Sequence, residues 1–151
     1  MTDIGVLGCG YVGKRLLTGR DWGKASWYGV HQNDPGIPGN KVAFSWADQS
    51  SWTNLPHHAD WLVVTIPPVY KVCEQERQRL TQWCEWMAEN RPNLKRLIYI
   101  STTGVYGSGS GVWTEQSECS PNALGGQLRL VSEQVLQQHF QCTVLRCGGI
   151  Y

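Results

Sequence analysis

The sequence predicts an α/β fold with a doubly wound parallel sheet of about six strands, in the order 3-2-1-4-5-6. Three observations predict it. Strand-like and helix-like segments alternate along the 151 residues, which favours a parallel sheet with helices on both faces. A glycine-rich turn follows the first strand-like segment. Further polar and glycine-containing segments follow predicted strands directly, so we expect them to meet at one edge of the sheet.

The first strand, turn and helix form the best-defined unit of the sequence. Residues 3–7 form a short segment that is apolar after Asp3, as expected of a buried strand. Residues 8–13 read GCGYVG. A helix is predicted over residues 11–18, with Gly19 in a position where helices commonly end. A Gly-x-Gly-x-x-Gly turn between a strand and a helix is the context that indicates a Rossmann dinucleotide site.

The remaining elements follow from apolar runs and from turn residues. Further strands are predicted at residues 26–31, 41–46, 61–65, 96–101 and 143–147. A helix is predicted over residues 69–89, where apolar residues recur at helical spacing. Ser120 is expected to cap the last helix, with Pro121 at its first position. The buried face of that helix is expected to hold Leu124, Leu128, Val131 and Val135.

The composition resembles that of an ordinary globular protein and argues against several kinds of partner. Hydrophobic residues make up 41% of the chain and charged residues 17%, and 13 basic residues against 12 acidic ones give a formal charge of +1. This balance offers no footprint for nucleic acid. No apolar run is long enough to cross a bilayer and no signal-peptide pattern is present, so we expect a cytoplasmic protein without a membrane partner.

The six cysteines form neither a Cys-x-x-Cys pair nor a zinc-type spacing, and the adjacent pair His57 and His58 has no cysteine beside it. We therefore expect no metal site. Reduced and mostly buried thiols are the simplest expectation for a protein of a reducing compartment.

Each glycine of the turn has its own physical purpose. Gly8 permits the tight turn, Gly10 lets a pyrophosphate approach the backbone, and Gly13 lets the helix pack closely on the strand. The first helical residues, Tyr11 and Val12, present free backbone N–H groups and the positive end of the helix dipole to the phosphates. The sequence therefore predicts a bound dinucleotide, against the alternative of a glycine turn that merely allows tight packing.

The choice between NAD and NADP is usually made at the end of the second strand, where an acidic residue binds the ribose 2′-hydroxyl. Here that position has no acid, and His31 stands there instead. The missing carboxylate favours NADP slightly, with His31 either contacting the 2′-phosphate or simply ending the strand. Asp48, after the third strand, is a candidate for the adenine amino group or, equally, for a helix cap.

A second group of motifs carries a resemblance to a known family. Residues 99–107 read YISTTGVYG and residues 145–151 read LRCGGIY. These segments resemble the Ser-Ser-x-x-Val-Tyr-Gly and Arg-x-x-Gly-Ile-Tyr segments of extended short-chain dehydrogenases/reductases, the NAD(P)-dependent epimerase/dehydratase family. Together with the glycine turn, the three motifs span almost the whole chain in the family's order.

The resemblance implies roles for particular residues and also shows a departure. In the family a hydroxyl residue orients the substrate oxygen, and that position falls on Thr102. A Tyr-x-x-x-Lys pair handles the proton, with the tyrosine as acid/base, but its two positions hold Gly125 and Arg129. Glycine cannot transfer a proton, so the chain resembles an atypical member of the family. Tyr106 is the nearest phenol to Thr102 and is a candidate to take over the acid/base role.

Each of these residues also has a plainer interpretation. Thr102 would then terminate its strand, Tyr106 would pack its ring in the following loop, and Arg129 would be a solvated cation, not a contact of cofactor hydroxyls or phosphate. Thr65 and Pro67 are expected to wall the nicotinamide side, although a proline here also ends a strand. Ser101 is included among the candidate cofactor contacts at the same edge.

The whole chain, residues 1–151, is interpreted as one NAD(P)-binding domain that lacks the C-terminal substrate-binding region of the family. Two function classes follow. One is an NAD(P)-dependent oxidoreductase or epimerase with a small-molecule substrate, for which a nucleotide sugar is a candidate. The other is a non-catalytic dinucleotide-binding sensor or scaffold. The substrate and the oligomeric state, with a homo-oligomer as one option, stay open at this stage.

Overall fold

The structure is a computed structural model and describes residues 3–19, 27–30 and 36–149. Six parallel strands form one sheet in the order β3-β2-β1-β4-β5-β6, which confirms the predicted topology. The strands are β1 (Ile4–Leu7), β2 (Trp27–Val30), β3 (Lys41–Ala43), β4 (Trp61–Val64), β5 (Arg96–Thr102) and β6 (Cys142–Cys147). The point where the strand order reverses lies between β1 and β4, and it is there that open α/β sheets bind ligands.

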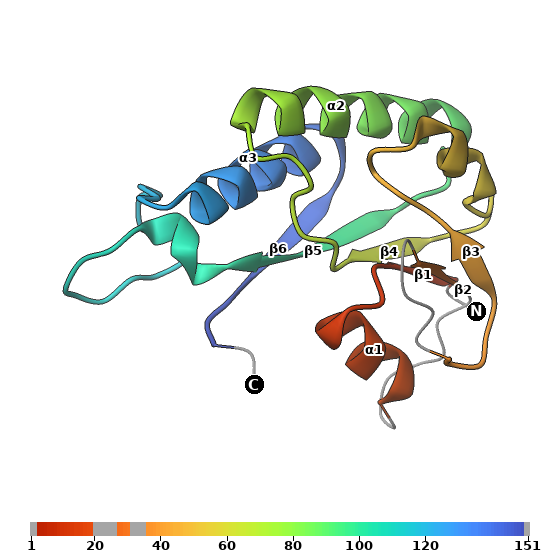
Figure 1. The fold of residues 1–151 in the computed structure, drawn as a ribbon, viewed down its shortest axis with the longest axis horizontal. Helices are drawn as coiled ribbons and strands as arrows, with labels where there is room; N and C mark the ends of the chain where they lie inside the picture. Colours follow the sequence, from red (N-terminus) through yellow and green to blue (C-terminus); the bar gives the residue numbers. More distant parts are fainter. Residues whose placement is uncertain (1–2, 20–26, 31–35, 150–151) are drawn as a thin grey trace.

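Helices cover both faces of the sheet. The α-helices are α1 (Tyr11–Thr18), α2 (Cys73–Asn90) and α3 (Leu124–His139), and two 3₁₀ helices, η1 (Gln49–Asn54) and η2 (Thr103–Tyr106), follow β3 and β5. Figure 1 shows α2 and α3 side by side over one face and α1 over the other. This is the doubly wound arrangement that the alternation of elements predicts.

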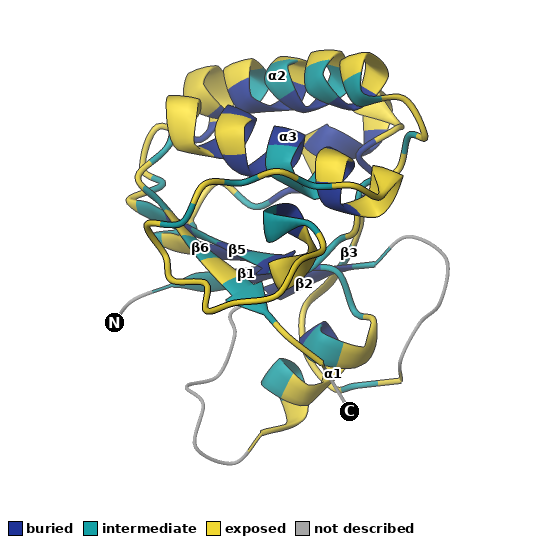
Figure 2. Ribbon diagram, turned by 90° about the vertical axis from the view of Figure 1, so that its left-hand side faces the viewer, coloured by how far each residue is buried: buried dark blue, intermediate teal, exposed yellow. Residues whose placement is uncertain are grey.

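The two faces are packed very differently. Successive residues of β4 show this, because Leu62 and Val64 belong to the large core under α2 and α3, whereas Val63 belongs to a small cluster with Val6 and Tyr28 on the α1 side. Figure 2 shows the buried inner sides of α2 and α3, while α1 is mostly exposed or half-buried. Among the described residues, the buried apolar surface is therefore concentrated on the α2 and α3 side of the sheet.

Two predicted helix starts are wrong. The helix predicted from residue 69 begins at Cys73, and Val69 and Val72 are about half exposed. The last helix begins at Leu124, with Ala123 as its N-cap in place of Ser120. The reason is that Asn122 is held elsewhere, since its Oδ1 accepts hydrogen bonds from the backbone N–H and the hydroxyl of Ser108.

Strand and core predictions also needed adjustment. The third strand ends at Ala43, three residues earlier than expected. The Phe44 N–H still donates to the Val30 carbonyl of β2, and residues 44–46 lie past the end of the strand. Of the predicted buried face of α3, Leu128, Val131 and Val135 are buried, but Leu124 is 44% exposed because it opens the helix.

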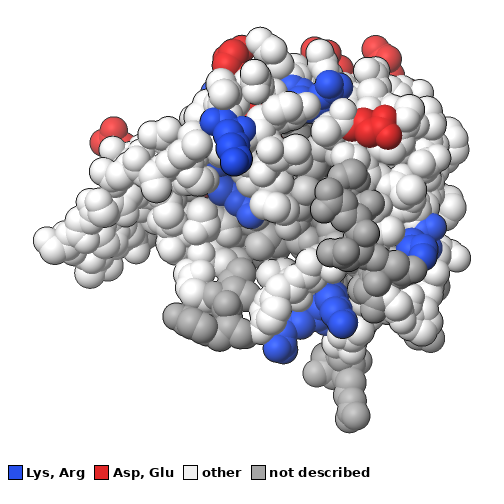
Figure 3. Space-filling model, viewed as in Figure 1, with Lys and Arg blue, Asp and Glu red and all other residues white. Residues whose placement is uncertain are grey.

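The surface agrees with the balanced composition. Figure 3 shows basic side chains in separate places on one face and acidic ones mostly along the edge formed by α2, without a continuous patch among the described residues of this view. Within the described part of the chain, none of the helices is both long and apolar enough to cross a membrane. All six cysteines are free thiols, but only Cys84 is fully buried, fewer than expected.

Candidate functional site

The glycine turn after β1 has the geometry that its sequence predicts. Gly8 has a φ of +103°, a backbone conformation that side chains with a Cβ rarely adopt. A Cβ at Gly13 would lie 1.9 Å from the carbonyl oxygen of Gly8, so no larger residue fits there without displacing the turn. The Thr65 hydroxyl, from the end of β4, lies 3.0 Å from the Gly8 carbonyl oxygen and donates to it. The turn is thus fixed from both neighbouring elements.

Gly10 differs from its two neighbours in the motif. A Cβ built on it meets nothing within 4 Å, so packing does not require glycine there. Gly10 is the N-cap of α1 and, having no side chain, makes no side-chain capping hydrogen bond. The first N–H groups of α1 consequently have no side-chain cap from this residue. An open backbone at a helix N-terminus is suited to an anion that approaches closely.

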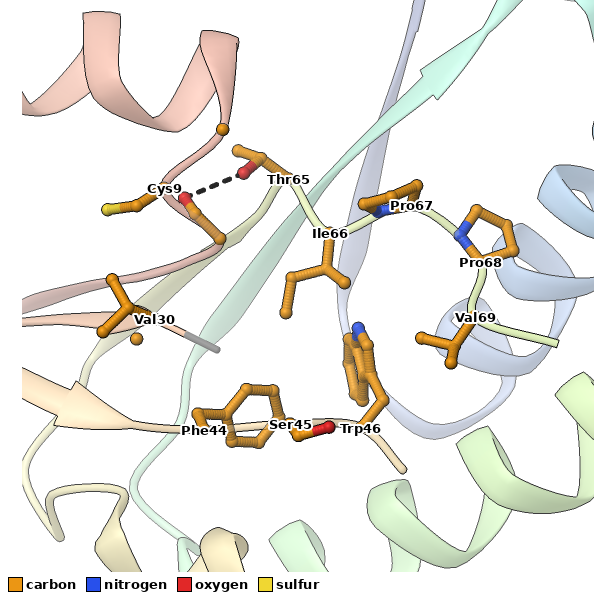
Figure 4. Close-up of a pocket in the computed structure, with 13 residues that line it drawn as sticks. Cys9, Val30, Phe44, Ser45, Trp46, Thr65, Ile66, Pro67, Pro68 and Val69 are labelled. Carbon is orange, nitrogen blue, oxygen red and sulfur yellow. Dashed lines mark hydrogen bonds between the residues drawn. The ribbon is translucent and has the colours of Figure 1, made fainter. Parts of the chain in front are cut away.

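A cleft of about 390 Å³ opens beside this turn, at the carboxyl ends of β1, β2 and β4. Its lining is mainly apolar. Figure 4 shows the Ile66 side chain directed into the space that Phe44 and Trp46 border from the other side, with Cys9 pointing away. The lining residues are Gly8, Cys9, Gly10, Gly29, Val30, Phe44, Ser45, Trp46, Thr65, Ile66, Pro67, Pro68 and Val69.

The aromatic wall of the cleft is anchored in the core. The rings of Phe44 and Trp46 meet edge to face with centroids 5.4 Å apart, and Trp46 packs on Trp83 of α2 at 4.4 Å. These residues were not predicted as part of the site because residues 44–46 were expected to lie inside the third strand. The signal that was available is their position at the carboxyl edge next to the switch point, where residues just past a strand line the ligand crevice.

The predicted cofactor residues divide into groups. Four of them line the cleft, namely Gly8, Gly10, Thr65 and Pro67. Tyr11, Val12 and Gly13, the second half of the glycine motif, form the first turn of α1. The Tyr11 ring is exposed and stacks with Arg15. His31 lies outside the described residues.

Asp48 does what the plainer of its two interpretations predicts. Its Oδ1 accepts hydrogen bonds from the backbone N–H of Ser50 at 3.0 Å and from the Ser50 hydroxyl at 2.6 Å, and it caps η1. The side chain is exposed and does not line the cleft.

The end of β5 carries a polar network. Ser101, only 4% exposed, donates from its hydroxyl to the Glu133 carboxylate of α3 at 2.5 Å. Glu133 is 1% exposed and forms an ion pair with Arg146 of β6, with 2.7 Å between Nη2 and Oε2. Arg146 in turn donates to the Tyr106 hydroxyl at 2.9 Å. Ser101 therefore faces α3 and lies outside the cleft lining.

The two predicted catalytic residues lie close in the chain but do not share a cavity. Thr102 caps η2 by accepting a hydrogen bond from the Gly104 N–H at 3.2 Å. Tyr106 lines a second cavity of about 570 Å³ on the β6 side, together with Trp113 and Leu145. Among the described residues, no acceptor is found for the phenolic proton of Tyr106, whose oxygen accepts from Arg146.

The position that the resemblance assigns to the lysine is occupied by Arg129, a half-buried cation whose guanidinium is hydrogen-bonded within the protein. Arg129 Nη1 donates to the Tyr99 hydroxyl and to the Ile100 carbonyl, each at 2.9 Å, and more weakly to the Ile66 carbonyl at 3.4 Å. The interpretation of Arg129 as a solvated surface cation is therefore wrong. A Cβ at Gly125, the tyrosine position, would meet nothing within 4 Å.

The described residues contain no group of three or more His, Cys, Asp or Glu side chains arranged to hold a metal ion. The site is therefore a glycine turn and an apolar cleft with hydroxyl-bearing residues at the neighbouring strand end.

Comparison with known proteins gives matches only at the level of structure. No protein-family model matches the chain, and no curated protein matches it by sequence. A short-chain dehydrogenase/reductase superfamily protein from Agrobacterium tumefaciens with bound NAD has a TM-score of 0.73 and 18% identity, over 95% of this chain and 48% of that one.

Two epimerases give similar values. UDP-glucuronic acid 4-epimerase from Bacillus cereus, in complex with NAD, has a TM-score of 0.74 and 20% identity, over 99% of this chain and 57% of that one. ADP-L-glycero-D-manno-heptose-6-epimerase from Helicobacter pylori has a TM-score of 0.72 and 19% identity, over 96% and 55%. The chain spans about half the length of these proteins. Over most of its own length, it shares its fold with short-chain dehydrogenases/reductases and NAD-dependent epimerases.

Proposed function

We propose that the chain binds a nicotinamide dinucleotide in the cleft between the glycine turn and the aromatic wall. The observation that carries the proposal is Gly10, which is open to solvent, heads α1 and borders an apolar cleft of about 390 Å³. The pyrophosphate would lie on the N–H groups at the start of α1. Phe44, Trp46 and Ile66 offer apolar surface for the rings of the ligand.

The solved structures favour NAD as the occupant. Both the Agrobacterium tumefaciens protein and the Bacillus cereus epimerase contain NAD. The slight preference for NADP expected from the missing acid at the end of β2 has no support from these proteins. We therefore propose NAD as the first ligand to test and NADP as the second.

We propose further that the chain belongs to an oxidoreductase or epimerase, with a nucleotide sugar as the candidate substrate class. The support is the shared fold with epimerases of such substrates and the position of Thr102 at the end of β5. The bound dinucleotide would supply hydride transfer. Thr102 would orient the substrate oxygen, and Tyr106 would hold the proton at its Oη, with Arg146 beside that atom.

A non-catalytic sensor or scaffold is the second candidate, and one specific observation favours it. By the sequence resemblance the tyrosine position falls on Gly125 and the lysine position on Arg129, and Arg129 is engaged in hydrogen bonds to Tyr99 and Ile100. Neither position offers a proton to a substrate. Tyr106 is the side chain on which the catalytic proposal depends.

The binding proposal is tested by titrating the protein with NAD⁺, NADH, NADP⁺ and NADPH in a calorimeter. A Gly10→Ala variant should fold normally, because the new methyl group meets no protein atom, yet bind at least about tenfold more weakly, a loss of about 1.4 kcal/mol. Gly148→Ala is the matched control, since its Cβ also meets nothing within 4 Å but lies outside the cleft. Equal affinity of the Gly10→Ala variant and the wild type would contradict the proposal.

The catalytic proposal needs a second experiment. Turnover of a panel of nucleotide sugars should be lost in Thr102→Ala and in Tyr106→Phe, while dinucleotide affinity is retained. A protein that binds the dinucleotide tightly but turns over none of the panel would favour the sensor.

A further inference from the structure

One wall of the cleft is a short segment without regular structure. This wall follows β4 and consists of Ile66, Pro67, Pro68 and Val69. It lines the cleft opposite Phe44 and Trp46, which follow β3 (Figure 4). The two prolines have no backbone N–H to donate. The first N–H groups that can anchor this wall after Ile66 are therefore those of Val69 and Tyr70.

Both of these N–H groups are held by one buried carboxylate. Glu76, in the first turn of α2, is 6% exposed. Its Oε2 accepts hydrogen bonds from the backbone N–H of Val69 at 3.1 Å and of Tyr70 at 3.0 Å. This contact explains why the helix begins at Cys73 and not at Val69. It also fixes the end of the cleft wall.

A buried carboxylate is costly unless charge and hydrogen bonds compensate it. The compensation here comes from the two N–H groups and from the positive charge of Arg129. Arg129 contacts the other end of the wall through its weaker hydrogen bond to the Ile66 carbonyl, while its stronger bonds go to β5. The wall therefore lies between an acidic side chain of α2 and a basic side chain of α3.

The space behind the wall is filled. Pro67, Pro68, Glu76 and Tyr99 are among the residues around a void of only about 10 Å³, the lower limit for a single water molecule. The wall cannot retreat from the cleft without moving these side chains. The position of the wall is thus fixed by its hydrogen bonds to Glu76 and by the packed side chains behind it.

We propose that Glu76 is a positioning residue of the dinucleotide cleft, whose carboxylate fixes the wall from Ile66 to Tyr70 at the separation from Phe44 and Trp46 that the ligand requires. Arg129 is its charge partner. The residue that the resemblance assigns to the lysine position therefore helps to hold the wall of the cleft in place. The inference rests on the proposed dinucleotide binding. It adds a residue that does not line the cleft and does not touch the ligand.

The test uses four variants of the 151-residue chain. Glu76→Ala removes the acceptor, Glu76→Asp keeps the charge but shortens the reach, and Glu76→Gln keeps an acceptor oxygen at the same reach without the charge. Glu74→Ala is the matched control, because Glu74 is an exposed carboxylate in the same helix that contacts only Gln78 among the described hydrogen bonds. Two quantities are measured: NAD⁺ affinity by calorimetry, and hydrogen exchange of the Val69 and Tyr70 amides in protein without dinucleotide.

The expected pattern separates positioning from folding. In Glu76→Ala and Glu76→Asp the Val69 and Tyr70 amides should exchange faster. NAD⁺ should bind about tenfold more weakly, the loss expected when only about a tenth of the molecules have the wall in its binding-competent position. Glu76→Gln should stay within about twofold of the wild type on the same scale, as should Glu74→Ala. If Glu76→Ala does not fold, the contrast between Glu76→Asp and Glu76→Gln carries the test.

Two results would overturn the inference. One is wild-type NAD⁺ affinity in Glu76→Asp and Glu76→Ala; the other is unchanged exchange of the Val69 and Tyr70 amides in these variants. A different result concerns the proposed function itself. If the wild type binds neither NAD⁺ nor NADP⁺, dinucleotide binding is refuted and the inference falls with it. If the wild type binds NAD⁺ and the Glu76 variants bind it equally well, only the role of Glu76 is refuted.

Discussion

The carbonyl oxygen of Gly8 occupies the place where a side chain at position 13 would begin, 1.9 Å from an ideal Cβ. Gly13→Ala must therefore push α1 away from the turn. We expect a loss of about 1–3 kcal/mol in the free energy of unfolding, as is typical of overpacking. Chemical denaturation of this variant beside Gly10→Ala measures the contrast. Equal stability of the two variants would contradict the geometry.

Gly125 offers the opposite case. It is the second residue of α3, and a Cβ there meets nothing within 4 Å. Glycine costs a helix about 0.5–1 kcal/mol relative to alanine, so Gly125→Ala should stabilise the protein by up to that amount. Thermal unfolding detects the rise. Gly126→Ala is the control, since its Cβ would lie 2.4 Å from the Gly104 carbonyl oxygen and should destabilise.

The ion pair between Glu133 and Arg146 predicts unequal effects of its removal. Arg146→Ala leaves the carboxylate of Glu133, 1% exposed, without its counter-charge. Breaking a buried pair in this way costs about 3–5 kcal/mol. Ser101→Ala removes a single hydrogen bond to a charged group and should cost about 1.5–3 kcal/mol. Urea denaturation of both variants is the measurement, and a smaller loss for Arg146→Ala would contradict the prediction.

The stability of the protein should depend on pH through Glu76. Burial raises the pKa of this carboxyl above its ordinary value, while the amides of Tyr70 and Val69 and the charge of Arg129 lower it only in part. The folded state then binds the proton more tightly than the unfolded state. The contribution of Glu76 is therefore fully present below the ordinary glutamate pKa and is lost as the pH rises through the raised value.

Comparison with Glu76→Gln isolates this contribution, because all other titrating groups are shared. The free energy of unfolding of the wild type, minus that of the variant, should fall as the pH rises through this window and level off above it. A difference that rises with pH would show that the pKa is lowered.

The thiols should differ in reactivity. Burial raises the pKa of Cys142 to about 12, with the negative charge of Glu133 acting in the same direction, and burial raises that of Cys84 as well. Since the thiolate is the reactive form, both should react slowly with an aromatic disulfide reagent at pH 8. All six cysteines should react rapidly in denaturant. Fast reaction of Cys84 in the native protein would contradict its burial.

The strands and the glycine turn could be predicted from local patterns, and the sheet order followed from the alternation of strands and helices behind such a turn. The strand residues are apolar over short runs, and the turn glycines need a conformation or a separation that other residues exclude, as at Gly8 and Gly13. Such requirements are visible in the sequence itself.

The errors arose where distant residues decide a local structure. The start of α2 is set by Glu76 accepting hydrogen bonds from the amides of Val69 and Tyr70. Arg129 donates to the carbonyl group of Ile66, in the segment after β4, and to that of Ile100 in β5. Helical periodicity carries no information about such contacts. The aromatic wall was missed for a related reason. β-propensity continues through Phe44 and Trp46, although the strand itself ends at Ala43 and Phe44 follows it with its N–H donating to the Val30 carbonyl of β2.

The unequal packing of the two sheet faces has an energetic consequence for ligand binding. On the α1 side the buried apolar residues Val6, Tyr28 and Val63 form only a small cluster among the described residues. The glycine turn thus lies on the more weakly packed side of the described domain, where local opening is expected to cost less. A dinucleotide on this turn would bridge α1 to the strongly packed half through the aromatic wall. At a hundred times its dissociation constant it would add about 2.7 kcal/mol of stability, and the protection of amides in α1 would report its binding most sensitively.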